Sequence, residues 1–380
     1  MYFSPKTSAD GLVFHYDTGN TVRSYLGEPT SNLVTNGNFS NSKTGWGFTN
    51  VANSATSVGT YQGRNALFAN GLKYYNESPG YFYQSISVTQ GVQYTISFKY
   101  YLLSGTLVFD PDGAYNGGGG LTQSGQWVNY SVTFTASTTS LTLNFYGASG
   151  VLAYYYITDI QLEAKSHATP FTTGTRSATQ GLKDLTAKNT IDISTVSFDS
   201  NAQMTFDGTD DYVDVGDLGT IGSTYSIECV FKSTSVTSYK NVFDMNYATY
   251  SGVTGNTGPR LEQTSGQGIN FIWSGVTNNN NLYNNTNLFA ISANTYYHVA
   301  FVQNGTTGAM YVNGTLRDQA NNAQGYLQTF GDFNIGRGFV LDPSRYFSGN
   351  VDMFKIFNRA LTADEVARNY NAIKSRFNIG

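Results

Sequence analysis

Apolar and polar residues alternate with a period of two along much of the chain. Because successive side chains of a strand point to opposite faces, this alternation predicts strands with one buried and one exposed face. The clearest examples are 93–102 (QYTISFKYYL), 127–136, 140–148, 225–233, 296–304 and 308–318. The gaps between them are rich in Gly, Asn, Ser and Thr, and NGTTG and VNGT are typical of tight turns. The pattern predicts an all-β protein built from antiparallel sandwiches.

One stretch, at the C-terminus, has helical periodicity instead. Thr362 is followed three residues later by Glu365, which is the capping-box pattern. An apolar stripe then recurs every three or four residues, at Val366, Tyr370, Ile373 and Phe377. We therefore expect a helix over 362–377 that packs on a sandwich and closes the chain.

The length of 380 residues suits two or three domains. A new domain begins at NLVTNGNFSN and extends over 32–165, and a linker-like stretch follows at 166–180. Two arrangements are compatible with this organisation. In one, the domains follow each other along the chain. In the other, residues 1–31 supply the opening strand or strands of the C-terminal sandwich (181–380), and 32–165 is inserted into that sandwich.

Composition restricts the classes of partner. Only 12% of residues are charged, the formal net charge is −4, and no Lys/Arg cluster forms the basic face that nucleic acids require. The single cysteine, Cys229, cannot form an intrachain disulfide, and its strand-like context predicts burial. The N-terminus has no signal-peptide pattern and no apolar run approaches membrane-spanning length, so we expect synthesis in the cytoplasm without membrane insertion.

The stretch FDGTDDYVDVGD (206–217) holds five aspartates in twelve residues. A metal cage or an acid–base pair would use such carboxylates, but Asp and Gly are also the ordinary residues of turns. Met204 and Phe206 would end one strand, and Val213 would begin the inner face of the next. We predict a hairpin here, with Asp211 at an exposed strand start and no catalytic role.

Motifs of nucleophilic or metal-assisted hydrolysis are missing. The sequence has no G-x-S-x-G elbow, and NGGGGLTQSG (116–125) lacks the G-K-[ST] of a phosphate-binding loop. The three histidines, His15, His167 and His298, lack metal-ligand spacing, and His298 lies in a strand-like context that predicts a structural role. We expect a protein that is not an enzyme.

Strand motifs in the C-terminal part follow a characteristic order: MTFDGTDDYVDVG (204–216), YSIECVFK (225–232), YYHVAFVQNGTTGAMYVNG (296–314), FNIGRG (333–338) and 346–372. In this order they resemble the laminin-G/concanavalin-A-like jelly rolls of phage structural proteins. GLVFHYDTGN (11–20) looks like the opening strand of that fold, which favours the insertion arrangement. Glucanases of this fold alternate Glu and Asp along one strand, and none of the six glutamates lies in such a pattern.

The middle part carries NLVTNGNFSNSKTGWGF (32–48), YQSISVTQGVQYTISFKYYL (83–102), WVNYSVTFTA and YITDIQLE. These resemble the jelly rolls of carbohydrate-binding modules, and 161–178 is similar to the joint that follows such modules in phage tail and capsid-surface proteins. The two resemblances imply two antiparallel jelly-roll sandwiches, the first inserted into the second, in a virion.

The second resemblance also implies a candidate metal site. Such modules often hold a structural calcium between the opening segment and the last strand, which would place Asn36, Asn38 and Asp159 near the ion. The sequence departs from the pattern, because Ser40 stands where an acidic residue is usual. We expect no required cofactor, and Ca²⁺ is the candidate structural ion.

Aromatic residues are the candidate carbohydrate contacts: Tyr74, Tyr75, Tyr81 and Tyr83 in the middle part, and Trp273 in the second sandwich. Tyrosine rings stack on sugars, fill subunit interfaces and pack within sheets, and the sequence leaves these alternatives open. We expect Trp46 and Trp127 in the core.

These features predict a non-enzymatic phage virion surface protein, either a capsid decoration, a head fibre or a tail-fibre component. It would reinforce the particle, adhere to host surface glycans through many weak copies, or both. Its partners would be other virion proteins and glycans, and its context favours a homo-oligomer such as a trimer. The alternatives are a free lectin, which would need a signal peptide, and a polysaccharide-degrading glycosidase, which would need two carboxylates facing one sugar.

Overall fold

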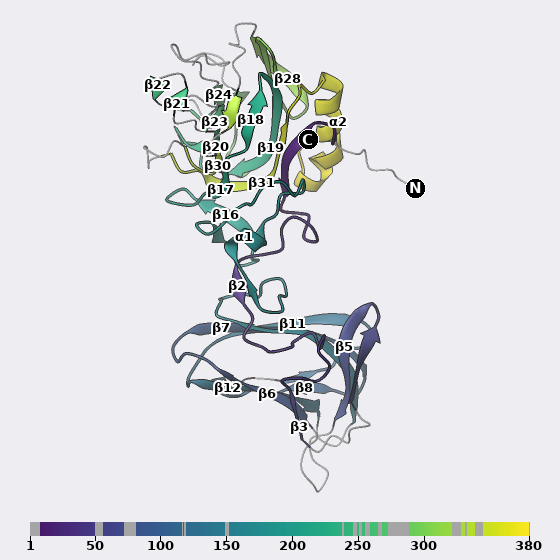
Figure 1. Ribbon diagram of the computed structural model, residues 1–380. Coiled ribbons are helices and arrows are strands. Elements are labelled where there is room, and N and C mark those ends of the chain that lie inside the picture. The colour runs from purple at the N-terminus through teal and green to yellow at the C-terminus, as the bar shows by residue number, and fades with distance from the viewer. Residues whose placement is uncertain are drawn as a thin grey trace. The chain divides into compact units, whose positions relative to one another are not determined.

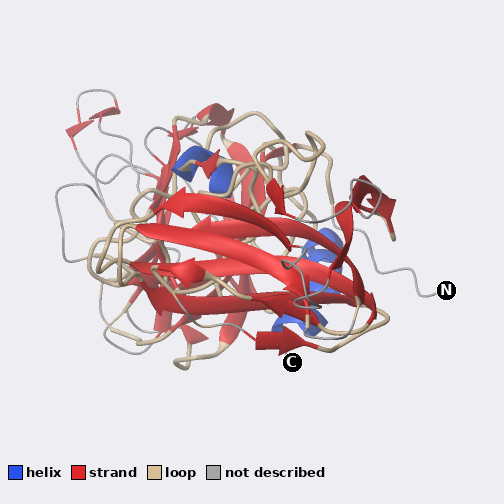
Figure 2. Ribbon diagram, turned by 90° about the horizontal axis from the view of Figure 1, so that it is seen from below, coloured by secondary structure: helices blue, strands red, loops and turns tan. Residues whose placement is uncertain are grey.

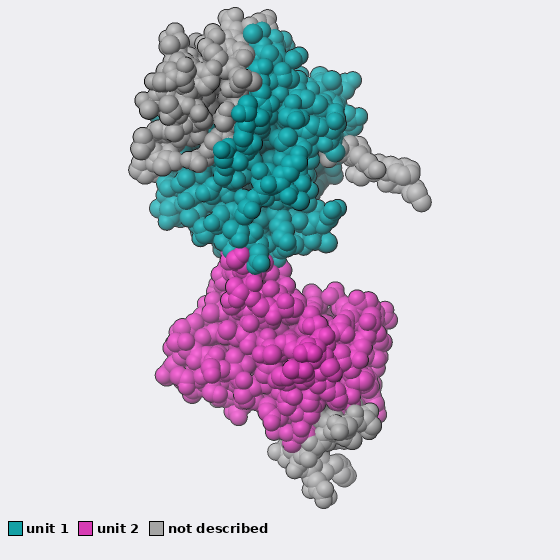
Figure 3. Space-filling view, viewed as in Figure 1, with its two compact units in different colours: residues 1–27, 178–199, 203–380 teal, residues 28–177, 200–202 magenta. Residues whose placement is uncertain are grey.

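The computed structural model describes residues 8–49, 56–71, 81–115, 117, 119–148, 152–237, 239–245, 249–250, 253–254, 259–264, 268–272, 289–320, 328–330, 333–338 and 345–379. The chain forms two compact units (Figure 3). Unit 1 comprises residues 1–27, 178–199 and 203–380, and unit 2 comprises 28–177 with 200–202. Strands make up most of the regular structure, which confirms the all-β class (Figure 2).

Unit 1 is a sandwich of two antiparallel sheets (Figure 1). The eight-stranded sheet contains β1 (Leu12–Asp17), β15 (Ser197–Phe198), β16 (Met204–Asp207), β19 (Thr224–Ser233), β26 (Tyr296–Asn304), β27 (Thr307–Val312), β28 (Thr315–Ala320) and β31 (Ser348–Phe357). The six-stranded sheet contains β17 (Val213–Gly216), β20 (Asn241–Met245), β23 (Arg260–Gln263), β24 (Gly268–Ile272), β25 (Phe289–Ala290) and β30 (Phe333–Ile335). Two short pairs accompany them: β18 (Gly219–Gly222) with β29 (Gln328–Phe330), and β21 (Thr249–Tyr250) with β22 (Val253–Thr254).

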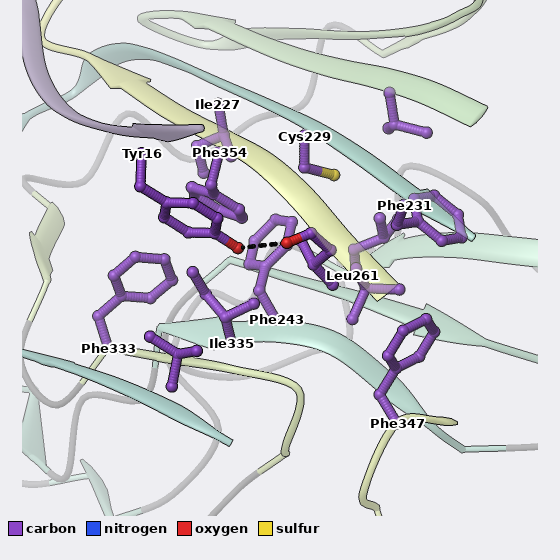
Figure 4. Close-up of a cluster of buried hydrophobic side chains, with 14 of the residues drawn as sticks. Tyr16, Ile227, Cys229, Phe231, Phe243, Leu261, Phe333, Ile335, Phe347 and Phe354 are labelled. Carbon is purple, nitrogen blue, oxygen red and sulfur yellow. Dashed lines mark hydrogen bonds between the residues drawn. The ribbon is translucent and has the colours of Figure 1, made fainter. Parts of the chain in front are cut away.

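The N-terminal strand β1 belongs to this C-terminal sandwich, because it pairs with β31. Its Tyr16 is fully buried among aromatic and aliphatic side chains of both sheets, and its hydroxyl donates to the Val351 carbonyl at 2.9 Å (Figure 4). Cys229 lies in the same core, as the sequence predicted.

The aspartate-rich stretch is not a hairpin. β16 pairs with β31 in the eight-stranded sheet, whereas β17 pairs with β30 in the six-stranded sheet, so the turn between them carries the chain from one sheet to the other. Asp211 is only 1% exposed rather than a solvent-facing strand start. Its carboxylate accepts hydrogen bonds from the Asp207 N–H (2.7 Å) and the Ser197 hydroxyl (3.1 Å), so it braces the corner.

The predicted C-terminal helix is present as α2 (Ala363–Phe377), and the capping box of Thr362 and Glu365 is formed. Its apolar stripe packs in two clusters on the outer face of the eight-stranded sheet. Between these clusters Asn369 donates to both carboxylate oxygens of the buried Glu228, at 3.0 and 2.9 Å. A short second helix, α1 (Ala178–Gly181), was not predicted.

Unit 2 is a second sandwich (Figure 1). Its six-stranded sheet contains β3 (Gly47–Thr49), β6 (Tyr81–Ser87), β8 (Leu107–Phe109), β9 (Asp112–Gly113), β10 (Gly119–Leu121) and β12 (Ser140–Gly147). Its five-stranded sheet has the order β11-β7-β13-β5-β4 and contains β4 (Thr56–Tyr61), β5 (Arg64–Gly71), β7 (Gln93–Ser104), β11 (Trp127–Thr135) and β13 (Ala153–Glu163). The chain enters and leaves unit 2 through β2 (Thr30–Ser31) and β14 (Thr175–Arg176), which pair with each other. Trp46 is in the core, as predicted.

Candidate functional site

The outer face of the five-stranded sheet of unit 2 carries the most distinctive group of side chains. On β7, alternate residues from Tyr94 to Leu102 fill the core, so Thr95, Ser97, Lys99 and Tyr101 face outward. Strand register places neighbours beside each of them on β11 and β13. The cross-strand rows read Ser131–Ser97–Gln161, Asn129–Lys99–Thr158 and Trp127–Tyr101–Tyr156.

The last of these rows is aromatic. Tyr61 stacks on Tyr156 with ring centroids 3.8 Å apart and planes 7° apart, and it meets Tyr101 edge-on at 5.1 Å. Tyr101 also contacts Trp127, with centroids 5.9 Å apart. We call Tyr61, Tyr101, Trp127 and Tyr156 the aromatic row. All four are half-buried, so part of each ring surface is open to solvent.

Trp127 was predicted in the core, and that prediction is wrong. The inward positions of β11 are Val128, Tyr130, Val132 and Phe134, which leaves Trp127 on the outer face opposite Tyr101. Strand register decides which face of the sheet a side chain occupies, and it places Trp127 on the outer face.

A charged group adjoins the aromatic row. Lys99 Nζ lies 2.8 Å from Asp159 Oδ2, and Arg64 Nη1 lies 3.5 Å from the same oxygen. The Arg64 guanidinium is 5.8 Å from the centre of the Trp127 ring, within cation–π range. Asp159 has a left-handed backbone (φ 53°) inside a register shift between Thr158 and Gln161, and this bulge places its carboxylate beside Lys99.

A pocket of about 260 Å³ lies over the polar rows next to this charged group. The sheet contributes Ser97, Lys99, Asn129, Ser131 and Asp159, and the segment 168–171 forms a wall that includes Pro170 and Phe171. We call this segment the pocket wall. Apolar surface combined with a few placed polar groups is the usual lining of small-molecule binding sites.

Buried hydrogen bonds fix the pocket wall in place. The Glu163 carboxylate accepts from the Thr169 N–H (2.8 Å), the Thr169 hydroxyl (2.7 Å), the Thr30 hydroxyl (2.7 Å) and Gln161 Nε2 (2.9 Å). Arg176 donates to the Pro170 carbonyl at 2.9 Å and to the Thr169 hydroxyl at 3.1 Å. The stretch that the sequence marks as linker-like is therefore tied into unit 2 through Ser177, and the pocket is formed before any ligand arrives.

Two of the aromatic residues singled out from the sequence lie elsewhere. Tyr81 and Tyr83 are on β6 in the other sheet of unit 2, with ring centroids 5.5 Å apart, and the Tyr83 ring covers Gly47. Tyr74, Tyr75 and Trp273 lie outside the described residues. Of the predicted aromatic contacts, the structure therefore brings Tyr81 and Tyr83 together, on a different sheet from the pocket.

The candidate calcium ligands are engaged by protein groups. Asn36 Oδ1 accepts from the Asn41 N–H (3.0 Å), and Asn38 Oδ1 accepts from the Ser40 N–H (3.2 Å). Asp159 faces two cations rather than other acidic oxygens. The opening segment does lie beside the last strand, because Ile160 N donates to the Gly37 carbonyl at 3.0 Å. Calcium binding stays a prediction.

Buried carboxylates in unit 1 are also paired. Glu228 lies 3.7 Å from His298 and 3.8 Å from Lys355 in addition to its Asn369 contacts, which agrees with a structural role for His298. Glu262 accepts from Arg345 at 3.1 Å. Carboxylate oxygens of Asp207, Asp210 and Asp211 lie within 4.8 Å of one another, but this cluster braces the corner turn.

Comparisons with known proteins agree with the two sandwiches. Residues 207–367 match the concanavalin A-like lectin/glucanases superfamily, and residues 31–151 match a carbohydrate-binding domain family. The chain thus carries a concanavalin A-like domain and a domain of the carbohydrate-binding type. The second match includes β4, β5, β7 and β11 of the site and ends before β13 and the pocket wall. No curated protein matches the chain.

Among solved structures, domain 4 of an extracellular arabinanase from Geobacillus stearothermophilus, in complex with arabinotriose, is 15% identical. The match covers 51% of this chain and 93% of that domain, with a TM-score of 0.37. The botulinum neurotoxin serotype D binding domain is 15% identical over 50% of this chain, with a TM-score of 0.38, and the match spans about half (49%) of that chain's length. A pentraxin from Limulus polyphemus is 19% identical over 43% of this chain and 78% of its own, with a TM-score of 0.35.

Proposed function

We propose that the protein binds glycans, without cleaving them, through the outer face of the five-stranded sheet of unit 2. The observation that carries this proposal is the aromatic row beside a preformed polar pocket, in a domain of the carbohydrate-binding type. The apolar faces of sugar rings would stack on Tyr101 and Trp127, and ring hydroxyls would bond to Ser97, Asn129 and Ser131. A shallow site with two stacking rings and a few hydroxyl contacts would bind weakly, so several copies would be needed for firm adhesion.

A glycan array probed with purified protein tests this proposal. The double variant Tyr101→Ala/Trp127→Ala should lose the signal, because it removes the stacking surface and leaves the core intact. The matched control is Tyr81→Ala/Tyr83→Ala, which removes two half-buried tyrosines from the other sheet and should bind like the wild type. Equal binding by both double variants, or loss only in the control, would place the site elsewhere and reject the proposal.

We further propose that the protein acts on the surface of a phage particle, as a capsid decoration, head fibre or tail-fibre component. Support comes from the resemblance of its sequence motifs to phage structural proteins and from the need for multiple copies at a weak site. Among the described residues, no helix is long and apolar enough to cross a membrane. Immunogold electron microscopy of phage particles tests this proposal, and particles that remain unlabelled in a lysate rich in the protein would reject it.

The oligomeric state and the calcium prediction belong to the same proposal. A decoration or fibre would assemble as a trimer, and light scattering on the purified protein tests this by measuring its mass.

A structural calcium ion would raise the melting temperature of unit 2 relative to the protein in EDTA, whereas identical melting curves would reject calcium binding.

A further inference from the structure

The charges around the pocket are unbalanced. Asp159 is the one carboxylate among the residues that line the pocket, and it faces two cations, Lys99 and Arg64. Lys99 is close to it at 2.8 Å, but Arg64 reaches the same oxygen only at 3.5 Å and its side chain is 42% exposed. A guanidinium has five N–H donors, so Arg64 keeps accessible donors for a second anion beside its long bond to Asp159. Together Lys99, Arg64 and Asp159 carry a net charge of +1.

One hydrogen-bond donor on this face also lacks an acceptor. The indole N–H of Trp127 is buried and donates to no acceptor in the described part of the chain. The Arg64 guanidinium lies 5.8 Å from the centre of the ring of the same Trp127, so this indole N–H and the guanidinium are close together. A buried donor without an acceptor is uncommon in folded proteins and needs a partner such as water or a bound group.

We propose that the ligand is an acidic glycan that bears carboxylate groups, such as a polymer containing uronic acids. This inference rests on the proposed glycan-binding function and specifies its substrate class. Arg64 and Lys99 share one carboxylate, Asp159, and a sugar carboxylate bound between them would balance the remaining positive charge. Arg64 suits this role because its planar guanidinium can bind a carboxylate with two hydrogen bonds. The sugar rings extend from there over the aromatic row.

The alternative for the same residues is a neutral sugar, with Asp159 accepting its hydroxyl groups. The two ligand classes predict opposite effects of one substitution. Asp159→Asn removes a negative charge that repels an acidic ligand and competes for Lys99 and Arg64, so affinity for an acidic glycan rises. For a neutral glycan the same substitution removes the strongest acceptor, so affinity falls.

The experiment is calorimetric titration of the full-length protein with a uronic-acid oligosaccharide and with its carboxyl-reduced counterpart, which differs only in the charged group. The wild type should prefer the acidic ligand, and its affinity should fall as NaCl is raised from about 0.05 M to about 0.5 M, because salt screens exposed charges. Arg64→Gln and Lys99→Met should each weaken acidic binding by about tenfold, the range expected for a charged hydrogen bond. Asp159→Asn should strengthen it.

Controls separate the failure of this inference from failure of glycan binding itself. Lys188→Met removes one exposed positive charge from unit 1 and should leave binding unchanged, and Lys99→Arg should retain acidic binding. If the reduced oligosaccharide binds as well as the acidic one, or if Asp159→Asn weakens acidic binding, the acidic class is wrong while glycan binding stands. If neither oligosaccharide nor any array glycan binds, both proposals fall.

Discussion

His15 and Asp244, both in unit 1, should make opposite contributions to its stability as the pH changes. Burial, reinforced by the charge of Lys355, lowers the pKa of His15 from 6.5 to about 4. Burial raises the pKa of Asp244 from 3.8 to about 7, against the opposing charges of Arg260 and Arg345. Both groups are therefore neutral in the folded protein between about pH 4 and pH 6.5, and both are charged in the unfolded chain.

The signs follow from proton counts. In this window the unfolded chain protonates His15 and the folded protein does not, so the His15 contribution falls as the pH is lowered. Asp244 is protonated only in the folded protein, so its contribution rises as the pH is lowered. Each contribution changes by about 1.4 kcal/mol per pH unit, or about 3 kcal/mol across the window, and in the wild type the two largely cancel.

Single substitutions should expose each contribution. Relative to the wild type, His15→Gln should gain about 3 kcal/mol of unfolding free energy on going from pH 6.5 to pH 4, and Asp244→Asn should lose about as much. Hydrogen exchange in urea, followed in peptides from β19 and β31, reports unfolding of unit 1 separately from unit 2. Variant curves parallel to the wild-type curve would show that these groups titrate normally and would refute the reasoning.

Three further predictions concern structure. Thr362→Ala removes the N-cap of α2 and should lower the free energy of unfolding of this helix by about 1 kcal/mol. Faster hydrogen exchange over 363–377 would show this loss, and unchanged exchange would contradict the capping role. Gly349→Ala should destabilise unit 1 by about 3 kcal/mol in urea unfolding, because its Cβ would lie 2.0 Å from the Lys232 carbonyl oxygen at a φ of 144°; a stable variant would refute this. Glu163→Gln places an amide donor against the N–H and hydroxyl donors of Thr169, so it should lower the free energy that holds the pocket wall closed by about 2 kcal/mol. Hydrogen exchange in the pocket wall should then be faster, and exchange as slow as in the wild type would show that Glu163 does not hold the wall.

Local sequence patterns predicted correctly the elements whose structure depends on residues close together in the sequence. The capping box and apolar stripe of α2 lie within sixteen residues, and the helix forms over nearly the whole predicted range. The stretch 308–318 was predicted as a strand and is two, β27 and β28, joined at Asn313 and Gly314, where VNGT had already indicated a turn.

Predictions failed where long-range pairing decides the outcome. The turn chemistry at 207–210 is the same whether the next strand returns to its own sheet or crosses to the other, and only the pairing of β16 with β31 and of β17 with β30 distinguishes the two. The candidate site also depends on the pairing of strands that are far apart in the sequence. Trp127 and Tyr101 meet through strand register, and Asp159 meets Lys99 across sixty residues of sequence, so period-two alternation alone could not bring them together.

The measurement that tests glycan binding at this face most directly is hydrogen exchange of the full-length protein with and without a bound uronic-acid oligosaccharide. Protection should appear in peptides that contain Ser97–Tyr101 of β7, Trp127–Ser131 of β11 and the pocket wall at 168–171. Protection confined to β6, where Tyr81 and Tyr83 lie, or to unit 1, would contradict the proposed site.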